Sequence, residues 1–334
     1  MVVLVHANYY SIGAPDANAI IIAPFSSFWR IFAEQLCIVG VNIFVLISGW
    51  FGINPTIRGI CSLFFQIVFW GLIIMAAGLF LNIPIPLRPS LKVLFFGSYY
   101  WFVPAYVGLF AFAPVLNSFI LHSSPRQIRI ILYSFFFIQA IFGWLTETGS
   151  YHAGYSFISF IGLYLLARYL NQYPNRFTSL PKRTYTFVYL AATLFPAIVS
   201  FYAIKYGFPN LSPIHYTSPF VILASLSLLL LFKRIEIKSS MINWIALSVF
   251  SVYIAHLHPV IDPIFRSFMV DLSEKMGTFS YTVSTLGIAL TITVVCAAID
   301  KIRITCWKGV YSGVLYRWEE QYNRHVRAIK TENH

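Results

Sequence analysis

Long apolar runs separated by short polar turns fill most of the sequence. A helix needs about 20 apolar residues to cross the roughly 30 Å of hydrocarbon in a bilayer, and nine runs approach or reach that length. They lie near residues 32–52, 60–82, 98–121, 127–145, 154–171, 184–206, 215–233, 241–261 and 279–300. Turns marked by proline and charge, such as 83–86 and 174–176, separate them because proline interrupts a helix. The pattern predicts a helical protein that crosses a membrane many times.

The amino-terminal residues 1–11 are apolar enough to lie in a membrane but too few to cross it. A secretory signal begins with a positively charged segment, whereas the first basic residue here is Arg30. We therefore expect these residues to be the end of a further span that begins before Met1. The predicted fold class is all-α, a polytopic transmembrane helical bundle of about ten spans with the first truncated.

We expect residues 1–301 to form the transmembrane domain and residues 302–334 to form a basic amphipathic tail. Aromatic residues such as Trp307 and Trp318 are mixed there with lysine and arginine. This mixture is typical of a segment that lies on the inner headgroup surface of a membrane.

Composition strengthens the membrane interpretation. Hydrophobic residues make up 58% of the chain and charged residues only 10%, whereas a soluble domain carries about a quarter charged residues. The net charge of +12 could indicate a nucleic-acid partner, but the basic residues lie between apolar runs and in the tail, so we expect none. The four cysteines have no paired spacing, and we expect neither a disulfide framework nor a metal site.

The distribution of basic residues predicts the orientation. In the ten-span arrangement, 17 of the 23 lysines and arginines fall on one side of the membrane and 6 on the other. Cytoplasmic loops are enriched in lysine and arginine. We therefore expect a multi-pass protein of the cytoplasmic (inner) membrane with both termini in the cytoplasm.

Histidines within apolar runs are the first candidates for catalysis. His6 follows the apolar residues 2–5, and His256 and His258 lie near the end of the run at 241–261. An ionisable group in hydrocarbon costs several kcal/mol unless it is paired or hydrated, and imidazole can take and return a proton near neutral pH. His6 is the leading catalytic candidate and His256 the second. The alternative for either is a histidine bonded to a neighbouring helix.

Other charged residues supply weaker candidates. Glu147, just after an apolar run, could orient a histidine or bind a sugar hydroxyl, and the alternative is a solvated interfacial carboxylate. Arg58, Arg126, Arg129 and Arg168 lie at predicted cytoplasmic ends of spans. Guanidinium groups bind phosphate with two hydrogen bonds, so these arginines could hold a donor such as coenzyme A. The alternative is that they set the topology and contact anionic lipid.

Five local patterns, taken in order, resemble the acyltransferase-3 family of multi-spanning membrane acyltransferases, many of which modify cell-surface polysaccharides. They are the apolar run ending in His6-Ala7; Gly40-Val41-Asn42-Ile43-Phe44-Val45-Leu46-Ile47-Ser48-Gly49-Trp50-Phe51; Tyr100-Trp101-Phe102 with Tyr106 and Ala113-Pro114-Val115-Leu116-Asn117; Gly154-Tyr155-Ser156 with Leu163-Tyr164-Leu165-Leu166-Ala167-Arg168-Tyr169; and the stretch from Ser248 to Pro259. Each pattern is degenerate, but their order and spacing extend the resemblance over nearly the whole chain.

The resemblance implies a chemistry. A family member takes an acyl group from a cytoplasmic donor, here expected to be acetyl-coenzyme A, and transfers it to a hydroxyl of a lipid-linked or growing glycan. His6 resembles the essential histidine at the end of the family's first span, where it would act as general base or carry the acyl group itself. The family also carries an arginine upstream of this histidine, at a position that would precede Met1, and a second basic motif that Arg58 alone could represent.

Two other functions are compatible with a helical bundle that encloses a polar cavity. One is a transporter or flippase for a glycan or a lipid. The other is an inactive relative that organises a synthesis complex. The expected partners of the enzyme are acyl-coenzyme A, a glycan acceptor and the lipid bilayer, while the sequence carries no signal of an oligomeric state.

Overall fold

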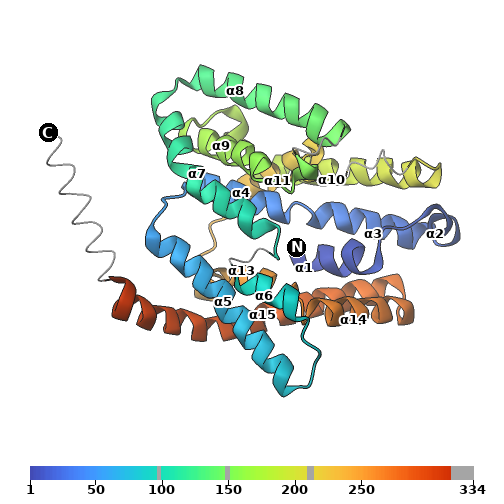
Figure 1. The fold of residues 1–334 in the computed structure, drawn as a ribbon. Coiled ribbons are helices and arrows are strands. Elements are labelled where there is room, and N and C mark those ends of the chain that lie inside the picture. The colour runs from blue at the N-terminus through green and yellow to red at the C-terminus, as the bar shows by residue number, and fades with distance from the viewer. Residues whose placement is uncertain (96–98, 147–150, 209–213, 317–334) are drawn as a thin grey trace. The chain divides into compact units, whose positions relative to one another are not determined.

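The computed structural model describes residues 1–95, 99–146, 151–208 and 214–316, and within them every regular element is a helix (Figure 1). The all-α class predicted from the sequence is therefore confirmed. The helices are α1 Val2–Val5, η1 His6–Tyr10, α2 Ala17–Ile22, α3 Pro24–Cys37, α4 Gly40–Phe51, α5 Ile57–Phe80, α6 Leu87–Leu94, α7 Phe102–His122, α8 Pro125–Ile138, η2 Gln139–Leu145, η3 His152–Gly154, α9 Phe157–Gln172, η4 Arg176–Ser179, α10 Lys182–Lys205, α11 Pro219–Lys233, α12 Ser240–Ala246, α13 Val249–His256, α14 Asp262–Lys275, α15 Thr278–Val310 and η6 Tyr311–Leu315.

Six helical segments among the described residues are long and apolar enough to cross a membrane. They are Pro24–Phe51, Ile57–Phe80, Phe102–His122, Pro125–Leu145, Lys182–Lys205 and Thr278–Gly313. Each contains one of the nine predicted runs nearly whole. The chain is thus a multi-pass membrane protein by length and composition, while the expected count of about ten spans is not reached.

The remaining predicted runs form shorter elements. The run at 154–171 becomes α9, with 16 residues, and the run at 215–233 becomes α11, with 15 residues. The run at 241–261 is divided into α12 and α13, which a turn at 247–248 separates. Residues 1–11 contain α1, of 4 residues, and the π-helical turn η1, of 5 residues. Apolar composition alone did not reveal these short lengths.

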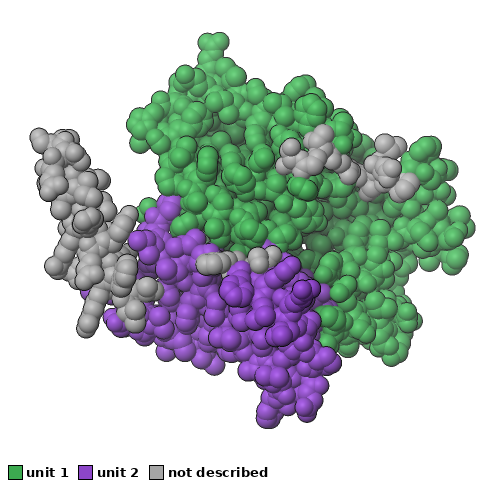
Figure 2. Space-filling view, in the orientation of Figure 1, with its two compact units in different colours: residues 1–54, 101–238, 263–289 green, residues 55–100, 239–262, 290–334 purple. Residues whose placement is uncertain are grey.

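The chain divides into two compact units, which Figure 2 distinguishes by colour. Unit 1 consists of residues 1–54, 101–238 and 263–289, and unit 2 consists of residues 55–100, 239–262 and 290–334. Neither the break before residue 55 nor the break after residue 289 coincides with the domain boundary expected near residue 301, and α15 continues through that position.

Unit 1 is a layered bundle in which α4 packs against α9 and α11, while α10 packs against α3 and α11. Proline at the first turn begins α3, α8 and α11, a position where its missing N–H costs nothing. A capping box at Ser124 and Gln127 additionally fixes the start of α8. The core of the unit therefore includes α4, against which two other helices pack.

Polar residues of α4 hold this packing together. The Asn42 side chain is buried and its Nδ2 donates to the Tyr216 carbonyl oxygen at 2.9 Å. The Ser48 hydroxyl bonds the Phe44 carbonyl at 3.0 Å and lies 3.1 Å from the Tyr106 hydroxyl. Small polar side chains that bond across helices are a common way to join helices in a membrane. These residues of the second family-like pattern therefore fix the packing of α4.

Unit 2 is organised around α5, which packs against α6 and α13. A buried ion pair lies within α15, where the Asp300 carboxylate accepts from Arg303 Nη2 at 2.7 Å. The same carboxylate joins α15 to α5 by accepting from Trp70 Nε1 at 3.1 Å and from Gln66 Nε2 at 3.3 Å. Asp300 is fully buried and Arg303 nearly so. The charge inside the unit is thus matched by a cation and by neutral donors, as burial of a carboxylate requires.

Candidate functional site

The leading catalytic candidate, His6, begins the π-helical turn η1. Such turns are rare and are frequent at functional sites. The His6 ring is half-buried and lies 5.1 Å from the Tyr10 ring, centroid to centroid. On the far side of that contact, Arg266 of α14 places its guanidinium carbon 5.2 Å from the centroid of the Tyr10 ring. His6 therefore belongs to an aromatic and cationic group within unit 1.

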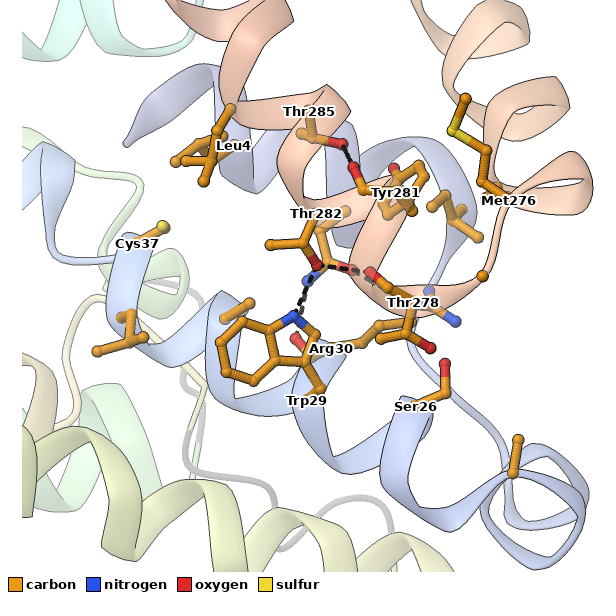
Figure 3. A pocket seen from close by; sticks show the side chains of 18 residues that line it. Leu4, Ser26, Trp29, Arg30, Cys37, Met276, Thr278, Tyr281, Thr282 and Thr285 are labelled. Carbon is orange, nitrogen blue, oxygen red and sulfur yellow. Dashed lines mark hydrogen bonds between the residues drawn. The ribbon is translucent and has the colours of Figure 1, made fainter.

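A cavity of about 590 Å³ lies beside the same turn in unit 1 (Figure 3). Three helical segments provide most of its lining, and Ala23, Ser273, Met276 and Gly277 complete it. The α1–η1 segment contributes Leu4, Asn8 and Ile12; α3 contributes Ser26, Trp29, Arg30, Ala33, Leu36 and Cys37; and α15 contributes Thr278, Tyr281, Thr282, Thr285 and Leu286. Spacings of three and four residues put each set on a single helix face. His6 is not among the lining residues, because it lies between Leu4 and Asn8 on another side of the turn.

Hydrogen bonds tie the three segments around this cavity. Trp29 Nε1 donates to the Thr282 hydroxyl at 2.8 Å, a bond drawn in Figure 3. The Tyr281 hydroxyl donates to the Ala7 carbonyl oxygen at 2.7 Å, directly after His6. The position of His6 is thus set by α15 through the main chain of its neighbour.

Asn8 connects the histidine turn to α3. Its Nδ2 donates to Glu34 Oε2 at 3.0 Å and to the Arg30 carbonyl at 2.8 Å, while its Oδ1 accepts from Arg30 Nε at 3.3 Å. Glu34 and Asn8 are both buried. The sequence analysis did not select Asn8 or Arg30 as site residues. The signal that could have found them is a buried asparagine two residues after the histidine, because a polar residue within an apolar run needs a partner.

The second catalytic candidate, His256, ends α13 in unit 2 and is buried, 2% exposed. Its Nδ1 lies 2.5 Å from the Val252 carbonyl oxygen. Because a carbonyl only accepts, Nδ1 must carry the hydrogen, and in the neutral ring the basic lone pair is then on Nε2. His256 is therefore held in one tautomer, as a general base would be.

His258 has the opposite tautomer. Its Nδ1 accepts from the Val260 main-chain N–H at 3.3 Å, so Nε2 carries the hydrogen of the neutral ring. The side chain is fully buried. The two neighbouring histidines therefore differ in which ring nitrogen carries the hydrogen in the neutral ring.

The third catalytic candidate, Glu147, lies outside the described residues. Its predicted role stays a prediction.

A second cavity, of about 430 Å³, lies in unit 1 where the carboxyl ends of α4, α7 and α9 meet. Its polar lining residues are Asn54, Asn117, Ser118, His122, Arg168 and Gln172. Tyr164 and Asn117 shape this cavity by hydrogen-bonding the main chain of Ile53. The tyrosine hydroxyl accepts from the Ile53 N–H at 3.0 Å, and Asn117 Nδ2 donates to the Ile53 carbonyl at 2.9 Å. The chain can turn here because Gly52 has a φ of +80°.

Of the four arginines proposed for donor binding, Arg168 lines one of the two cavities described here. Arg126 and Arg129 are exposed on α8 and do not line it. Arg58 belongs to unit 2, where its guanidinium carbon lies 4.2 Å from the Tyr311 ring centroid. Phosphate binding by these four arginines stays a prediction.

Comparison with known proteins supplies the family. Neither the curated proteins nor the solved structures gave a match. A family model described as an acyltransferase domain matches residues 1–299, about nine-tenths of the chain and including His6, His256 and Arg168. The resemblance seen in the sequence is thereby confirmed, and the chain belongs to the acyltransferase-3 family.

Proposed function

We propose that the protein is a membrane acyltransferase that moves an acyl group, acetyl in particular, from a coenzyme A thioester to a hydroxyl of a cell-surface or lipid-linked glycan. The observation that carries the proposal is the family match over residues 1–299. Six helices long and apolar enough to cross a bilayer support a reaction at a membrane, where a soluble donor and a membrane-attached acceptor could both reach the protein.

In the proposed reaction His6 acts as the general base. The acceptor hydroxyl attacks the thioester carbonyl as its proton passes to the imidazole, and the coenzyme A thiolate leaves and takes that proton from the imidazolium. The products are the acyl ester and free coenzyme A, so atoms and protons balance. The π-helical turn and the Tyr281 bond to the Ala7 carbonyl support this role, because they hold the His6 main chain in place.

The cavity around Arg168 is the proposed site for the phosphates of the donor. Helix carboxyl ends carry partial negative charge, so three of them around one cavity would repel an anion. Arg168 and, when protonated, His122 supply the opposing charge at that place. The affinity for the donor should therefore depend strongly on Arg168. It should depend much less on Arg126 and Arg129, the exposed arginines of α8.

The test uses membranes that contain the full chain, incubated with acetyl-coenzyme A labelled in the acetyl group and with a glycan acceptor. His6→Ala should reduce label transfer by about 10²-fold or more, the contribution typical of a general base. His152→Asn is the matched control, because His152 is exposed with a φ of +43° that asparagine tolerates. Transfer that survives His6→Ala would remove His6 from the mechanism.

The donor site is tested in the same assay by varying acetyl-coenzyme A. Arg168→Gln should raise KM for the donor by about tenfold with a smaller change in kcat, because a charged hydrogen bond of about 1.5 kcal/mol is lost. Arg126→Gln and Arg129→Gln remove the same charge outside the cavity and should leave KM within about twofold. Equal effects of all three would contradict the site. Glycan movement across vesicles without label transfer would favour a transporter.

A further inference from the structure

The cavity beside η1 has a polar end and an apolar end. Ser26, Arg30 and Thr278 lie toward the amino-terminal ends of α3 and α15, whereas Cys37 and Leu286 line it further along the same helices. Figure 3 shows Ser26 and Thr278 close together and away from Leu4 and Cys37. From Ser26 to Cys37 the helix rises about 16 Å at 1.5 Å per residue, so the cavity is long as well as polarised. An elongated ligand with one polar end matches this shape.

The polar end carries positive charge. The Arg30 side chain donates hydrogen bonds to neutral oxygens, Asn8 Oδ1 and the Gly13 carbonyl, which orient its charge and do not neutralise it. Glu34 is the acid of the group formed by Asn8, Arg30 and Glu34. Asn8 links Arg30 to Glu34, because it accepts from the guanidinium and donates to the carboxylate. The guanidinium has five N–H donors and keeps some for a ligand. The charge at this end fits an anionic group.

The apolar end is reached from the membrane side of unit 1. Leu286 lines the cavity and is 53% exposed, and Val283, one turn earlier on the same helix, is 52% exposed. α15 is one of the apolar helices long enough to cross a bilayer, so its exposed apolar side faces hydrocarbon. A lipid chain can therefore enter between α3 and α15 without passing through water.

We propose that this cavity binds an anionic membrane lipid, with one hydrocarbon chain along α3 and α15 and the phosphate against Arg30. This ligand combines the three properties of the cavity: length, an apolar end open to hydrocarbon, and a cation at the other end. The site goes beyond the proposed acyl transfer and does not depend on it. Asn8 serves as a positioning residue that directs the guanidinium toward the headgroup.

The experiment measures lipids retained by the purified full chain after exchange into mixed micelles. The micelles contain equal amounts of phosphatidylglycerol and phosphatidylcholine with the same oleoyl chains, and retained lipid is counted by native mass spectrometry. We expect phosphatidylglycerol to be retained about fivefold over phosphatidylcholine, the effect of about one basic residue beside an anionic lipid. Arg30→Gln should remove this preference, and Ala33→Phe should reduce retention of both lipids by filling the cavity.

Lys205→Gln is the matched control, because Lys205 is an exposed cation of unit 1 at the end of α10 that does not line the cavity. It should retain the wild-type preference. Equal losses in Arg30→Gln and Lys205→Gln would overturn the proposal, as would full retention by a folded Ala33→Phe variant. Inorganic phosphate should not displace the lipid, and complete displacement would mean that the site binds a phosphate ion and no chain.

A second measurement uses the fluorescence of a residue that lines the cavity. Trp29 lines it, so brominated chains of a bound lipid should quench its fluorescence. The Trp29 signal is the difference between the wild type and Trp29→Phe. Brominated phosphatidylglycerol should quench this signal more strongly than brominated phosphatidylcholine at the same concentration. Equal quenching would contradict an anionic-lipid site, and because neither readout uses acyl transfer, it would leave the proposed enzyme function untouched.

Discussion

Gly49 of α4 lies directly against the main chain of Tyr164 in α9: a Cβ atom at position 49 would be 2.5 Å from the Tyr164 carbonyl oxygen. No real Cβ makes such a contact with main chain, so the two helices pack at this distance only because residue 49 is glycine. Tyr164 in turn bonds Asn117 and Ile53 beside the Arg168 cavity. The glycine thus sets the position of the residues that shape the proposed donor site.

Gly49→Ala should destabilise the protein by about 1–3 kcal/mol, because the helices must separate or shift. The measurement is thermal unfolding of the purified protein in detergent. Gly309→Ala provides the control, since a Cβ there meets nothing within 4 Å and alanine favours a helix. A lower melting temperature for both variants alike would show that close approach is not the cause.

Asp300→Asn should cost about 3–5 kcal/mol of stability, because it leaves the buried Arg303 without its counter-charge. Asp271→Asn is the comparison: its partner Lys275 and Asp271 itself are 70% and 52% exposed, and this pair should contribute less than about 1 kcal/mol. The double change Asp300→Leu with Arg303→Met should be milder than Asp300→Asn. Denaturant titration in detergent gives the free energy of unfolding of all three variants. Equal losses of stability in Asp300→Asn and Asp271→Asn would contradict the larger contribution of the buried pair.

Asn42→Ala should lower stability by about 1–3 kcal/mol, because the buried Tyr216 carbonyl loses its donor. Asn18→Ala changes the same side chain at an exposed position of α2 and should have an effect within about 0.5 kcal/mol. Acyl transfer per folded molecule should be retained by the Asn42 variant. Loss of transfer at unchanged stability would instead assign Asn42 a role in binding substrate.

Replacing His256 by asparagine or by glutamine distinguishes the role of its Nδ1 from the role of its Nε2. In His256→Asn the amide nitrogen takes the place of Nδ1 and can still donate to the Val252 carbonyl, so the melting temperature should be retained. His256→Gln carries its amide further out and should lose that bond and some stability. If Nε2 takes part in proton transfer, the asparagine variant loses label transfer by about 10²-fold or more. Full transfer by a stable asparagine variant would exclude His256 as acid or base.

Much of the fold could be predicted because the solvent is a bilayer. A long apolar run has one stable solution in hydrocarbon, a hydrogen-bonded helix, so most of α5, α7, α10 and α15 followed from composition alone. The break at Leu247 and Ser248 could not be predicted in the same way. The residues before it, 241–247, are as apolar as a span, and the break is completed by Lys301, more than fifty positions later in the chain.

The candidate site was predictable to the extent that rare residue types mark it. A histidine in an apolar run is conspicuous, so His6 and His256 could be chosen from the sequence. Arg168 was one of four arginine candidates, and it lines the second cavity. Asn8, Arg30 and Glu34 were missed as a group because their partners are 22 and 26 residues apart along the chain. Asp300 was missed because it lies at the end of an apolar run, where a carboxylate is usually solvated.

The Lys301 contact has a consequence for how deep His256 lies. Its ammonium donates to the Trp244 carbonyl and to the Ser248 hydroxyl, the groups at the start of α13. An ammonium at the bilayer centre costs about 2.5–3.5 kcal/mol, so this lysine anchors the beginning of α13 near the lipid headgroups. α13 has 8 residues and rises about 12 Å in all, which is a little less than half of a hydrocarbon layer roughly 30 Å thick. The imidazole at its other end therefore lies within about 12 Å of the Lys301 contact along the helix axis, and it is buried, 2% exposed.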